Sequence, residues 1–348
     1  MYELEPLSDE DTRNWDRLIE PYERRAFFHR KVWLDFLAAS RNARIRYWSI
    51  RSSGRTIGFF VGGIIRKGPF RILGSPLRGW GTNVLGPVVN TDFDPPRFIA
   101  ALDHTARQEG ISMVEIESAL LPEAHLDELG YNPVRSKTLI VELSPQDPDV
   151  MFRRIHRTAR YQIGRAKRNG LTVEDCNDIG IVRESYDQWT EVLARKGLSP
   201  YYPERWVRLA FEKLKPLDLL FALCVRDPNG KPIATGLFPH DDKTLYYSLC
   251  TGSRIASWHL FPNDLLHWTA MEMAARRGLR VYNMCGYGHF RTQFGGELQE
   301  TVRWHKFYNR SARVARSSYE RLYDMRIHLR GWWNGKIARV GHREEAGE

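Results

Sequence analysis

Two stretches of the sequence, 168 residues apart, share one pattern: Ala106-Arg107-Gln108-Glu109-Gly110-Ile111-Ser112-Met113-Val114 and Ala274-Ala275-Arg276-Arg277-Gly278-Leu279-Arg280-Val281-Tyr282. Both stretches have the pattern of an amphipathic helix end, a glycine for the left-handed C-terminal position, and a buried strand. Helix–glycine–strand junctions are common in α/β proteins, so one match alone is weak evidence of duplication.

A second correspondence precedes each of these stretches. A hairpin predicted over 45–60, with its turn at 52–54, matches one predicted over 219–234, with its turn at 227–230. In both places, turn-forming residues separate two runs of apolar and β-branched residues, which is typical of a hairpin. Two matches in the same order and at similar offsets indicate an internal repeat.

Each copy therefore consists of a helix, antiparallel hairpin strands, a helix and a strand. This order predicts a mixed α/β fold with an antiparallel meander, not the strict βαβ alternation of a doubly wound parallel sheet. We expect a first domain over 1–147 and a second over 148–348, divided at the Pro-rich turn Ser144–Pro148. A basic amphipathic helix over 148–169 should open the second domain, and a basic C-terminal helix around 319–333 should end it.

Composition excludes several classes of protein. The chain has 348 residues, of which 42% are hydrophobic, and this ordinary globular mixture excludes a wholly disordered or fibrous chain. No apolar run approaches the roughly 20 residues of a membrane span, and the polar start is unlike a secretory signal peptide. The four cysteines lie far apart without a CxxC pair. They predict reduced thiols in a cytoplasm, with neither a disulfide framework nor a zinc site.

The positive charge is concentrated in one half. Residues 1–150 carry a net charge of −2 and residues 151–348 a net charge of +12. Met151–Gly170 alone has seven basic residues and no acidic one. This asymmetry favours contact with a polyanion or an anionic surface over a merely solvated helix face. Charge alone leaves tRNA, lipid phosphate and a nucleotide cofactor open.

Most catalytic motifs are absent: there is no P-loop, no GxGxxG after a strand, no HExxH and no GxSxG. The distinctive segment is Val281–Glu297, where four glycines are flanked by aromatic residues and Arg291. Glycine lets the backbone approach a ligand closely, and arginine is a permanent cation with bidentate reach to phosphate or carboxylate. Phe290 and Phe294 would share a helical face and anchor the loop. The alternative is a glycine-rich loop with a surface arginine.

These segments resemble the Fem-type aminoacyltransferases and the related acetyltransferase-like group. Phe290-Arg291-x-x-Phe294-Gly295 is similar to the family's Phe-Lys-x-x-Phe-Gly element, 152–170 resembles its basic helix, and 261–268 resembles the helix before its last core strand. The resemblance covers about residues 25–310. It implies two tandem GNAT-like domains facing a shared cleft, in an acyltransferase that forms an amide on an amine acceptor.

The resemblance also implies the substrates. Members attach an amino acid, often from aminoacyl-tRNA, to an amine of a peptidoglycan precursor, and others are acyl-CoA-dependent acetyltransferases of polysaccharide synthesis. This chain has Arg291 where the family often has Lys and Asn283 where an Asp is common. It lacks a helical-arm insertion and a clear [QR]-x-x-G-x-[GA] pyrophosphate loop. We therefore expect aminoacyl transfer in a cell-wall pathway, with no tightly bound cofactor and no metal.

Two alternative functions are compatible with the same residues. One is acyl-CoA-dependent transfer to a saccharide or lipid-linked acceptor, and the other is a non-catalytic nucleic-acid-binding protein. We expect a cytoplasmic protein. The helix around 319–333 ends in Trp332-Trp333, which would suit an anionic inner membrane face as well as packing on the core.

Transfer from an activated ester needs a carbonyl held close to a neutral amine and donors for the oxyanion. The residues expected to carry the chemistry are Arg291, Asn283, Tyr247 and Glu297. Arg291 would offset phosphate or oxyanion charge, Asn283 and Tyr247 would orient the amine, and Glu297 is a second-line candidate for the base. The residues expected to bind substrate are Phe290, Tyr287, Gly286, Gly288, Phe294, Tyr202, Arg153, Arg157 and Arg160.

Overall fold

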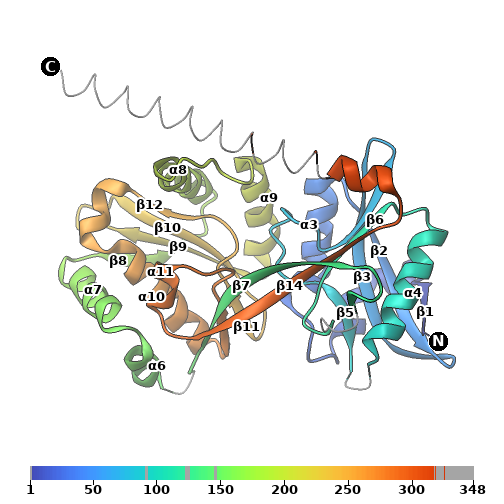
Figure 1. Ribbon diagram of the computed structural model, residues 1–348. Helices are drawn as coiled ribbons and strands as arrows, with labels where there is room; N and C mark the ends of the chain where they lie inside the picture. Colours follow the sequence, from blue (N-terminus) through green and yellow to red (C-terminus); the bar gives the residue numbers. More distant parts are fainter. Residues whose placement is uncertain are drawn as a thin grey trace. The chain divides into compact units, whose positions relative to one another are not determined.

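A computed structural model of the chain describes residues 2–90, 93–121, 126–144, 147–316, 318 and 325. It divides into two compact units (Figure 1). Unit 1 comprises Met1–Thr138 and Leu298–Ala315, and unit 2 comprises Leu139–Glu297 and Arg316–Glu348. This division differs from the predicted boundary between 147 and 148 in two ways: the first segment of unit 1 ends earlier, at Thr138, and the last strand returns the chain to unit 1.

Unit 1 is built on a mixed sheet in the order β1-β2-β3-β4-β6-β14, with β5 paired to β3. The β4 and β6 strands are parallel, whereas β2, β3 and β4 form an antiparallel meander. The strands are β1 (Tyr2–Pro6), β2 (Arg44–Ser52), β3 (Arg55–Lys67), β4 (Phe70–Ser75), β5 (Gly86–Val89), β6 (Met113–Glu117) and β14 (Glu297–Phe307). The helices are α1 (Asp9–Arg13), α2 (Trp15–Ile19), α3 (Lys31–Arg41) and α4 (Pro95–Gln108), with a 3-10 helix at Phe27–His29.

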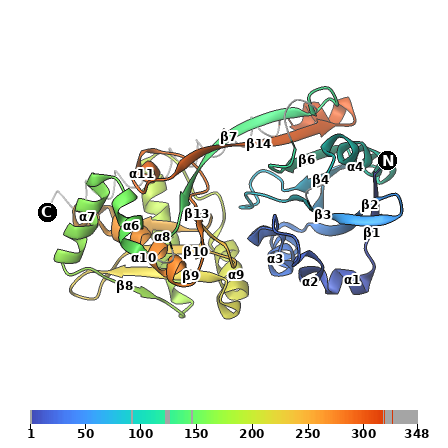
Figure 2. The same cartoon turned by 90° about the horizontal axis from the view of Figure 1, so that it is seen from below.

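Alternation along the strands of unit 1 gives its sheet two apolar faces. On one face, Trp48 stacks on Phe60, which contacts Phe98 of α4. On the other face, Tyr47 and Phe59 contact Trp15 of α2. Figure 2 accordingly shows α4 on one side of these strands and α1, α2 and α3 on the other. Two packed layers therefore cover the sheet.

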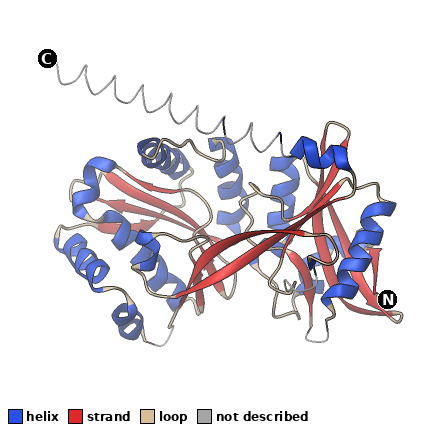
Figure 3. Ribbon diagram, viewed as in Figure 1, coloured by secondary structure: helices blue, strands red, loops and turns tan. Residues whose placement is uncertain are grey.

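Unit 2 contains a second sheet in the order β12-β10-β9-β8. It also contains β13, which pairs with the end of β7, and β11, which pairs with β13. Its strands are the end of β7 (Asn132–Glu142) and the whole of β8 (Thr172–Asp175), β9 (Leu220–Arg226), β10 (Pro232–Pro239), β11 (Thr244–Tyr246), β12 (Thr251–Ser253) and β13 (Val281–Asn283). Its helices are α6 (Pro148–Arg154), α7 (Arg157–Arg168), α8 (Gly180–Arg195), α9 (Glu204–Leu214), α10 (Pro262–Arg276) and α11 (His289–Thr292), with 3-10 helices at Lys215–Leu217 and Ile255–Leu260. Figure 3 shows helices on both sides of the second sheet.

The internal repeat is confirmed at the level of single hydrogen bonds. Both predicted hairpins form, as β2–β3 and as β9–β10. After α4 the Ile111 amide donates to the Ala106 carbonyl at 2.8 Å, and after α10 the Leu279 amide donates to the Ala274 carbonyl at 3.0 Å. Gly110 and Gly278 occupy the positive-φ position between helix and strand in the two copies. The mixed α/β class with antiparallel hairpins is therefore confirmed.

The predicted basic helix over 148–169 is wrong as a single element. It is broken into α6 and α7 at Ile155–His156, where both residues have extended backbone. The break is held from outside, because the His156 amide donates to the Gln293 carbonyl at 2.8 Å. The His156 side chain then accepts from the Thr158 amide and caps α7. Amphipathic periodicity continues across the break, so the sequence pattern did not reveal it.

Two strands connect the units. The first residues of β7 and nearly all of β14 lie in unit 1, whereas the end of β7 and the first residue of β14 lie in unit 2. No described helix is both long enough and apolar enough to cross a membrane. The basic helix expected around 319–333 lies outside the described residues, apart from an isolated Met325. The shared cleft stays a prediction.

Candidate functional site

The expected loop begins where two parallel strands of unit 2 separate. Strand β11 runs beside β13 as far as the pair Tyr246 and Asn283. The Tyr247 amide makes the last bond of this run, to the Asn283 carbonyl at 2.9 Å. Beyond it, Thr251 of β12 pairs with Gly236 of β10, and the chain after β13 turns away. Tyr247 and Asn283 therefore sit at the fork between the two paths.

A tight turn follows the fork. The Asn283 Oδ1 atom accepts from the Cys285 amide at 2.8 Å, and Cys285 has a positive φ of 50°. This side chain holds the turn, so its amide oxygen is already engaged. The structure thus gives Asn283 a positioning contact, whereas its expected contact with an amine stays a prediction.

Arg291 lies on α11 and points back to the fork. Its Nε donates to the Met284 carbonyl at 3.0 Å, and its Cζ lies 4.7 Å from the centre of the Tyr247 ring. A Cβ placed on Gly286 would lie 3.6 Å from the same Cζ, so the backbone passes directly against the guanidinium. Within the described part of the chain, no carboxylate forms an ion pair with Arg291. No carboxylate of the described chain therefore neutralises its charge, and a guanidinium can donate from its Nη groups to an anion.

A buried aromatic cluster supports the loop. The His267 Nδ1 lies 2.7 Å from the Tyr282 hydroxyl, and its ring contacts those of Phe290 and Phe294 at centroid distances of 5.2 and 5.3 Å. Phe290 and Phe294 also contact each other at 5.3 Å, which confirms that they share a face. Burial, assisted by the charge of Arg291, lowers the pKa of His267 to about 3, so the imidazole is neutral.

Glycine is required at the end of the loop. Gly295 and Gly296 have φ values of 76° and 104°. A Cβ on Gly295 would lie 2.9 Å from the Arg154 carbonyl oxygen, and one on Gly296 would lie 2.4 Å from that of Ile140. The loop therefore packs its backbone against α6 and β7.

The remaining predicted residues lie in different surroundings. Arg153 and Arg157 are exposed on α6 and α7, and Arg160 is partly buried with an Nε that has no partner among the described residues. Tyr287 is 56% exposed, and Glu297 is exposed where β14 begins. Gly288 directly precedes α11. Tyr202 instead stacks on Trp206 at 4.1 Å, within an aromatic group of α8 and α9. The structure thus gathers Arg291, Asn283, Tyr247, Phe290, Phe294 and Gly286, whereas Tyr202 belongs to that separate group.

Sequence reasoning missed a buried carboxyl group. Asp264, in the first turn of α10, is 6% exposed, and its Oδ1 has no hydrogen-bond partner among the described residues. Burial raises its pKa to about 7. An acid in the first turn of a helix is ordinary on a surface, so only its burial distinguishes it. No sequence pattern signalled that burial.

The chain resembles known proteins in part of its sequence and in its fold. The sequence model of the acetyltransferase (GNAT) domain family matches residues 153–294. The crystal structure of FemX matches with a TM-score of 0.67 at 13% identity, over 86% of this chain and 96% of FemX. L-PGS from Bacillus licheniformis matches at 0.52 and 16%, over 88% and 94%. A tandem GNAT protein from the clavulanic acid biosynthesis pathway matches at 0.51 and 13%, over 89% and 99%. No curated protein matches the sequence. At these identities the likeness shows the fold, and the doubled GNAT fold of the Fem type is confirmed.

Proposed function

We propose that this chain, an acyltransferase of the GNAT type with a doubled GNAT fold, transfers an aminoacyl group from aminoacyl-tRNA to an amine of a peptidoglycan-precursor-like peptide. The observation that carries the proposal is the guanidinium of Arg291. It is held by the Met284 carbonyl and the Tyr247 ring, without a carboxylate partner in the described chain. A partly buried cation without a carboxylate partner is suited to an anionic ligand or a developing oxyanion.

The reaction needs little from the protein. The acceptor amine attacks the ester carbonyl, the new C–N bond forms, the C–O bond to the ribose breaks, and a proton passes from the amine to the leaving hydroxyl. Arg291 stabilises negative charge on the substrate, and it does not serve as the base because a guanidinium does not deprotonate in proteins. Backbone amides at Gly286–Gly288 are further candidate donors, and Tyr247 and Glu297 are candidates for handling the amine.

Helix α7 supports an RNA donor. It carries five basic side chains, and no carboxylate of the described chain forms an ion pair with any of them; they are Arg157, Arg160, Arg165, Lys167 and Arg168. The Tyr161 ring is 56% exposed among them, with the Arg165 guanidinium 6.0 Å from its centre. Cations interleaved with an exposed aromatic ring are typical of single-stranded nucleic-acid binding. Arg153, near the end of α6, is a further exposed cation that precedes α7 in the chain.

An acyl-CoA donor is the second candidate, because the matching domain family is one of acetyltransferases. Its acceptor would be a saccharide or lipid-linked molecule. One feature of unit 2 argues against an acyl-CoA donor. Helix α10 begins at Pro262, which has no amide hydrogen, and its first turn contains the buried carboxyl group of Asp264. A helix N-terminus binds phosphate through free amides and its dipole, and this one is poorly prepared for a pyrophosphate.

Parallel transfer assays test the donor. The protein is incubated with radiolabelled aminoacyl-tRNAs and, separately, with radiolabelled acyl-CoAs, each with peptidoglycan precursors as acceptors. We expect transfer from aminoacyl-tRNA, a loss of at least 100-fold in Arg291→Ala, and partial activity in Arg291→Lys because the charge remains. Arg276→Ala, on the exposed side of α10, is the matched control and should retain full activity.

Transfer from acyl-CoA alone would establish the second candidate. Tight RNA binding without any transfer would indicate the non-catalytic alternative, and an unchanged rate in Arg291→Ala would remove the central role of this arginine.

A further inference from the structure

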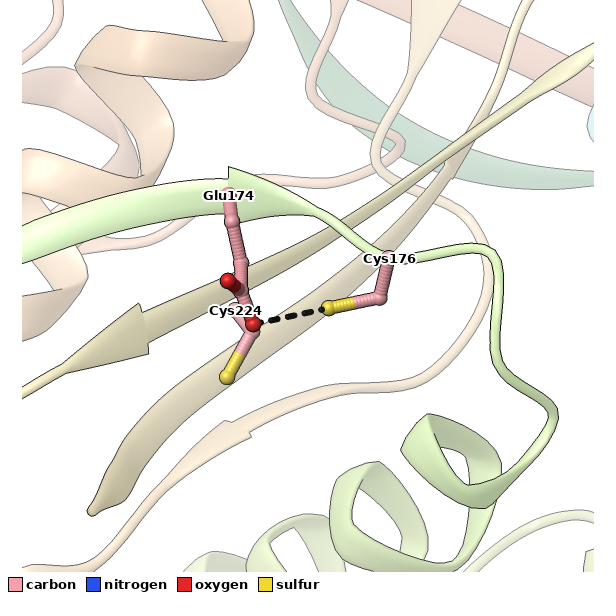
Figure 4. A group of neighbouring side chains, drawn as sticks. All are labelled: Glu174, Cys176 and Cys224. Atoms are coloured by element: carbon pink, nitrogen blue, oxygen red, sulfur yellow. Dashed lines mark hydrogen bonds between the residues drawn. The ribbon is translucent and has the colours of Figure 1, made fainter. Parts of the chain in front are cut away.

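Two cysteines that are 48 positions apart in the sequence lie together in unit 2. Cys176 directly follows β8 and Cys224 lies in β9. Their sulfur atoms and a carboxylate oxygen of Glu174 all lie within 4.8 Å of one another (Figure 4). Strand pairing thus joins residues that sequence spacing separates, so the absence of a CxxC pair did not reveal this arrangement. We propose that Glu174, Cys176 and Cys224 form a binding site for a thiophilic divalent metal ion of the Zn²⁺ type.

The strand register puts the three side chains on one face. Glu174 is paired directly with Cys224, and the Cys176 amide donates to the Ala222 carbonyl at 2.8 Å. Residues two apart on a strand share a face, so Glu174 and Cys176 both stand beside Cys224. The Cys176 sulfur lies 3.5 Å from Glu174 Oε1. Zinc bonds of about 2.3 Å to sulfur and 2.0–2.2 Å to oxygen, at a tetrahedral angle, put those ligand atoms about 3.5 Å apart.

The same register argues against a disulfide. Cys176 is diagonal to Cys224 across the two strands, and diagonal neighbours are roughly 7–8 Å apart. A disulfide needs Cα atoms within about 6.8 Å, so its formation would require the strands to move. A metal ion bridges the longer separation, because two sulfurs on one zinc ion are about 3.8 Å apart rather than about 2 Å.

Charge also favours a metal ion. Binding releases one proton from each thiol, so two thiolates and one carboxylate around a dication have a net charge of −1. Arg226 supplies the balancing charge: its Nη2 lies 2.6 Å from Glu174 Oε1, and its Nε donates to the same oxygen at 2.7 Å. Ligating carboxylates commonly have such a hydrogen-bond partner. Glu174 is exposed, Cys176 is partly exposed and Cys224 is buried, so an ion would enter from the side of Glu174 and Cys176.

Metal titration of the reduced full-length protein tests this site. Apo-protein is titrated anaerobically with Zn²⁺ against a chromophoric chelator, and with Co²⁺ to record thiolate charge-transfer absorption. We expect one ion per chain, a thiolate band, and a Tm that rises with Zn²⁺ and falls again with chelator. Cys176→Ser and Cys224→Ser should each weaken binding by at least 100-fold, and Arg226→Gln by about 10-fold. Cys250→Ser is the matched control, since its thiol is buried elsewhere in unit 2, and it should bind like wild type.

Several outcomes would overturn the proposal. They are the absence of a thiolate band in wild type, unchanged affinity in Cys176→Ser, and a Cys176–Cys224 disulfide that forms under mild oxidation in the presence of Zn²⁺. Should Cys224→Ser fail to fold, the partly exposed Cys176 carries the test. None of these readouts uses acyl transfer, so the site stands or fails independently of the proposed function.

Discussion

Two contacts hold the guanidinium of Arg291, and one of them is the Tyr247 ring. A cation above an aromatic face gains about 0.5–2 kcal/mol, depending on how far it is desolvated. We expect Tyr247→Leu to lower kcat/KM for transfer by about 2- to 30-fold. Tyr247→Phe should lower kcat/KM less, because it keeps the ring contact with Arg291 and loses only the hydroxyl that could handle the amine. Steady-state kinetics of the two variants measure this. If Tyr247→Phe lowers kcat/KM as much as Tyr247→Leu does, the hydroxyl and not the ring is the important group.

His267 makes stability depend on pH in a defined direction. Its pKa is about 3 in the folded protein against an ordinary value of 6.5. A base with a depressed pKa contributes stability above pH 6.5, and this contribution is lost as the pH falls towards 3, because the unfolded chain takes up the proton first. We expect His267→Asn to cost about 1–3 kcal/mol at pH 8. The difference from wild type should shrink by about 2 kcal/mol at pH 5. Urea unfolding at the two pH values measures it, and a difference that is the same at both would contradict a neutral buried imidazole.

Asp264 should make stability depend on pH in the opposite direction. Its pKa of about 7 in the folded protein exceeds the ordinary value of 3.8. Its contribution to folding stability is therefore complete below pH 3.8 and is lost as the pH rises through 7. Removing the charge removes this loss. We expect the free energy of unfolding of Asp264→Asn to exceed that of wild type by about 1–3 kcal/mol at pH 8 and to be close to that of wild type at pH 4. Lower stability of the variant at pH 8 would instead show that the carboxylate has a favourable partner when ionised.

At the scale of elements, the end of the loop depends on close backbone packing. A side chain at position 296 would meet the Ile140 carbonyl at 2.4 Å and would also strain a positive φ. Gly197 is the matched control, since it has a φ of 69° but nothing within 4 Å of an added Cβ. We expect Gly197→Ala to cost about 1 kcal/mol and Gly296→Ala about 3 kcal/mol or more, because only the second adds a backbone clash. Denaturant unfolding measures both, and equal costs would show that the loop moves away without difficulty.

Local chemistry made several elements predictable. Turn residues fixed the two hairpins, and Gly110 and Gly278 marked the helix–strand junctions because only glycine takes the left-handed position at little cost. The break between α6 and α7 was not predictable, because its cause is a hydrogen bond from His156 to a residue more than 130 positions away. The candidate site, too, was predictable only in part. Arg291 and its flanking phenylalanines were found from their spacing, whereas the contact of His267 with Tyr282 depends on tertiary packing.

At the scale of the molecule, duplication explains why the architecture could be predicted. Each copy repeats the same local signals, and the copies confirm each other. The unit boundary was not predictable, because β14 follows the second copy in the chain yet pairs with β6 of the first. Strand pairing of this kind leaves no local signal in the sequence. The doubled fold could therefore be predicted from repetition, and the assignment of Leu298–Ala315 to unit 1 could not.

The charge of the second half gives the last prediction, which concerns RNA binding by the full chain. Each phosphate neutralised by a basic side chain releases condensed counterions, so the logarithm of the affinity falls with the logarithm of salt concentration by about 0.7–0.9 per contact. Arg157 and Arg160 on α7 have no ion pair with a described carboxylate. We expect the double variant Arg157→Ala/Arg160→Ala to lower the salt slope for tRNA by about 1–2, as measured by filter binding over a salt series.

The matched control for this measurement is Arg183→Ala/Arg208→Ala, on α8 and α9. Both of these guanidinium groups already form ion pairs with Glu204, at 3.1 and 3.2 Å. A side chain neutralised within the protein has less charge to offer to a phosphate, so the control should leave the slope nearly unchanged. If both double variants reduce the slope equally, tRNA responds to the net charge of the chain and not to the unpaired face of α7. In that case the basic helix has no specific part in holding the donor.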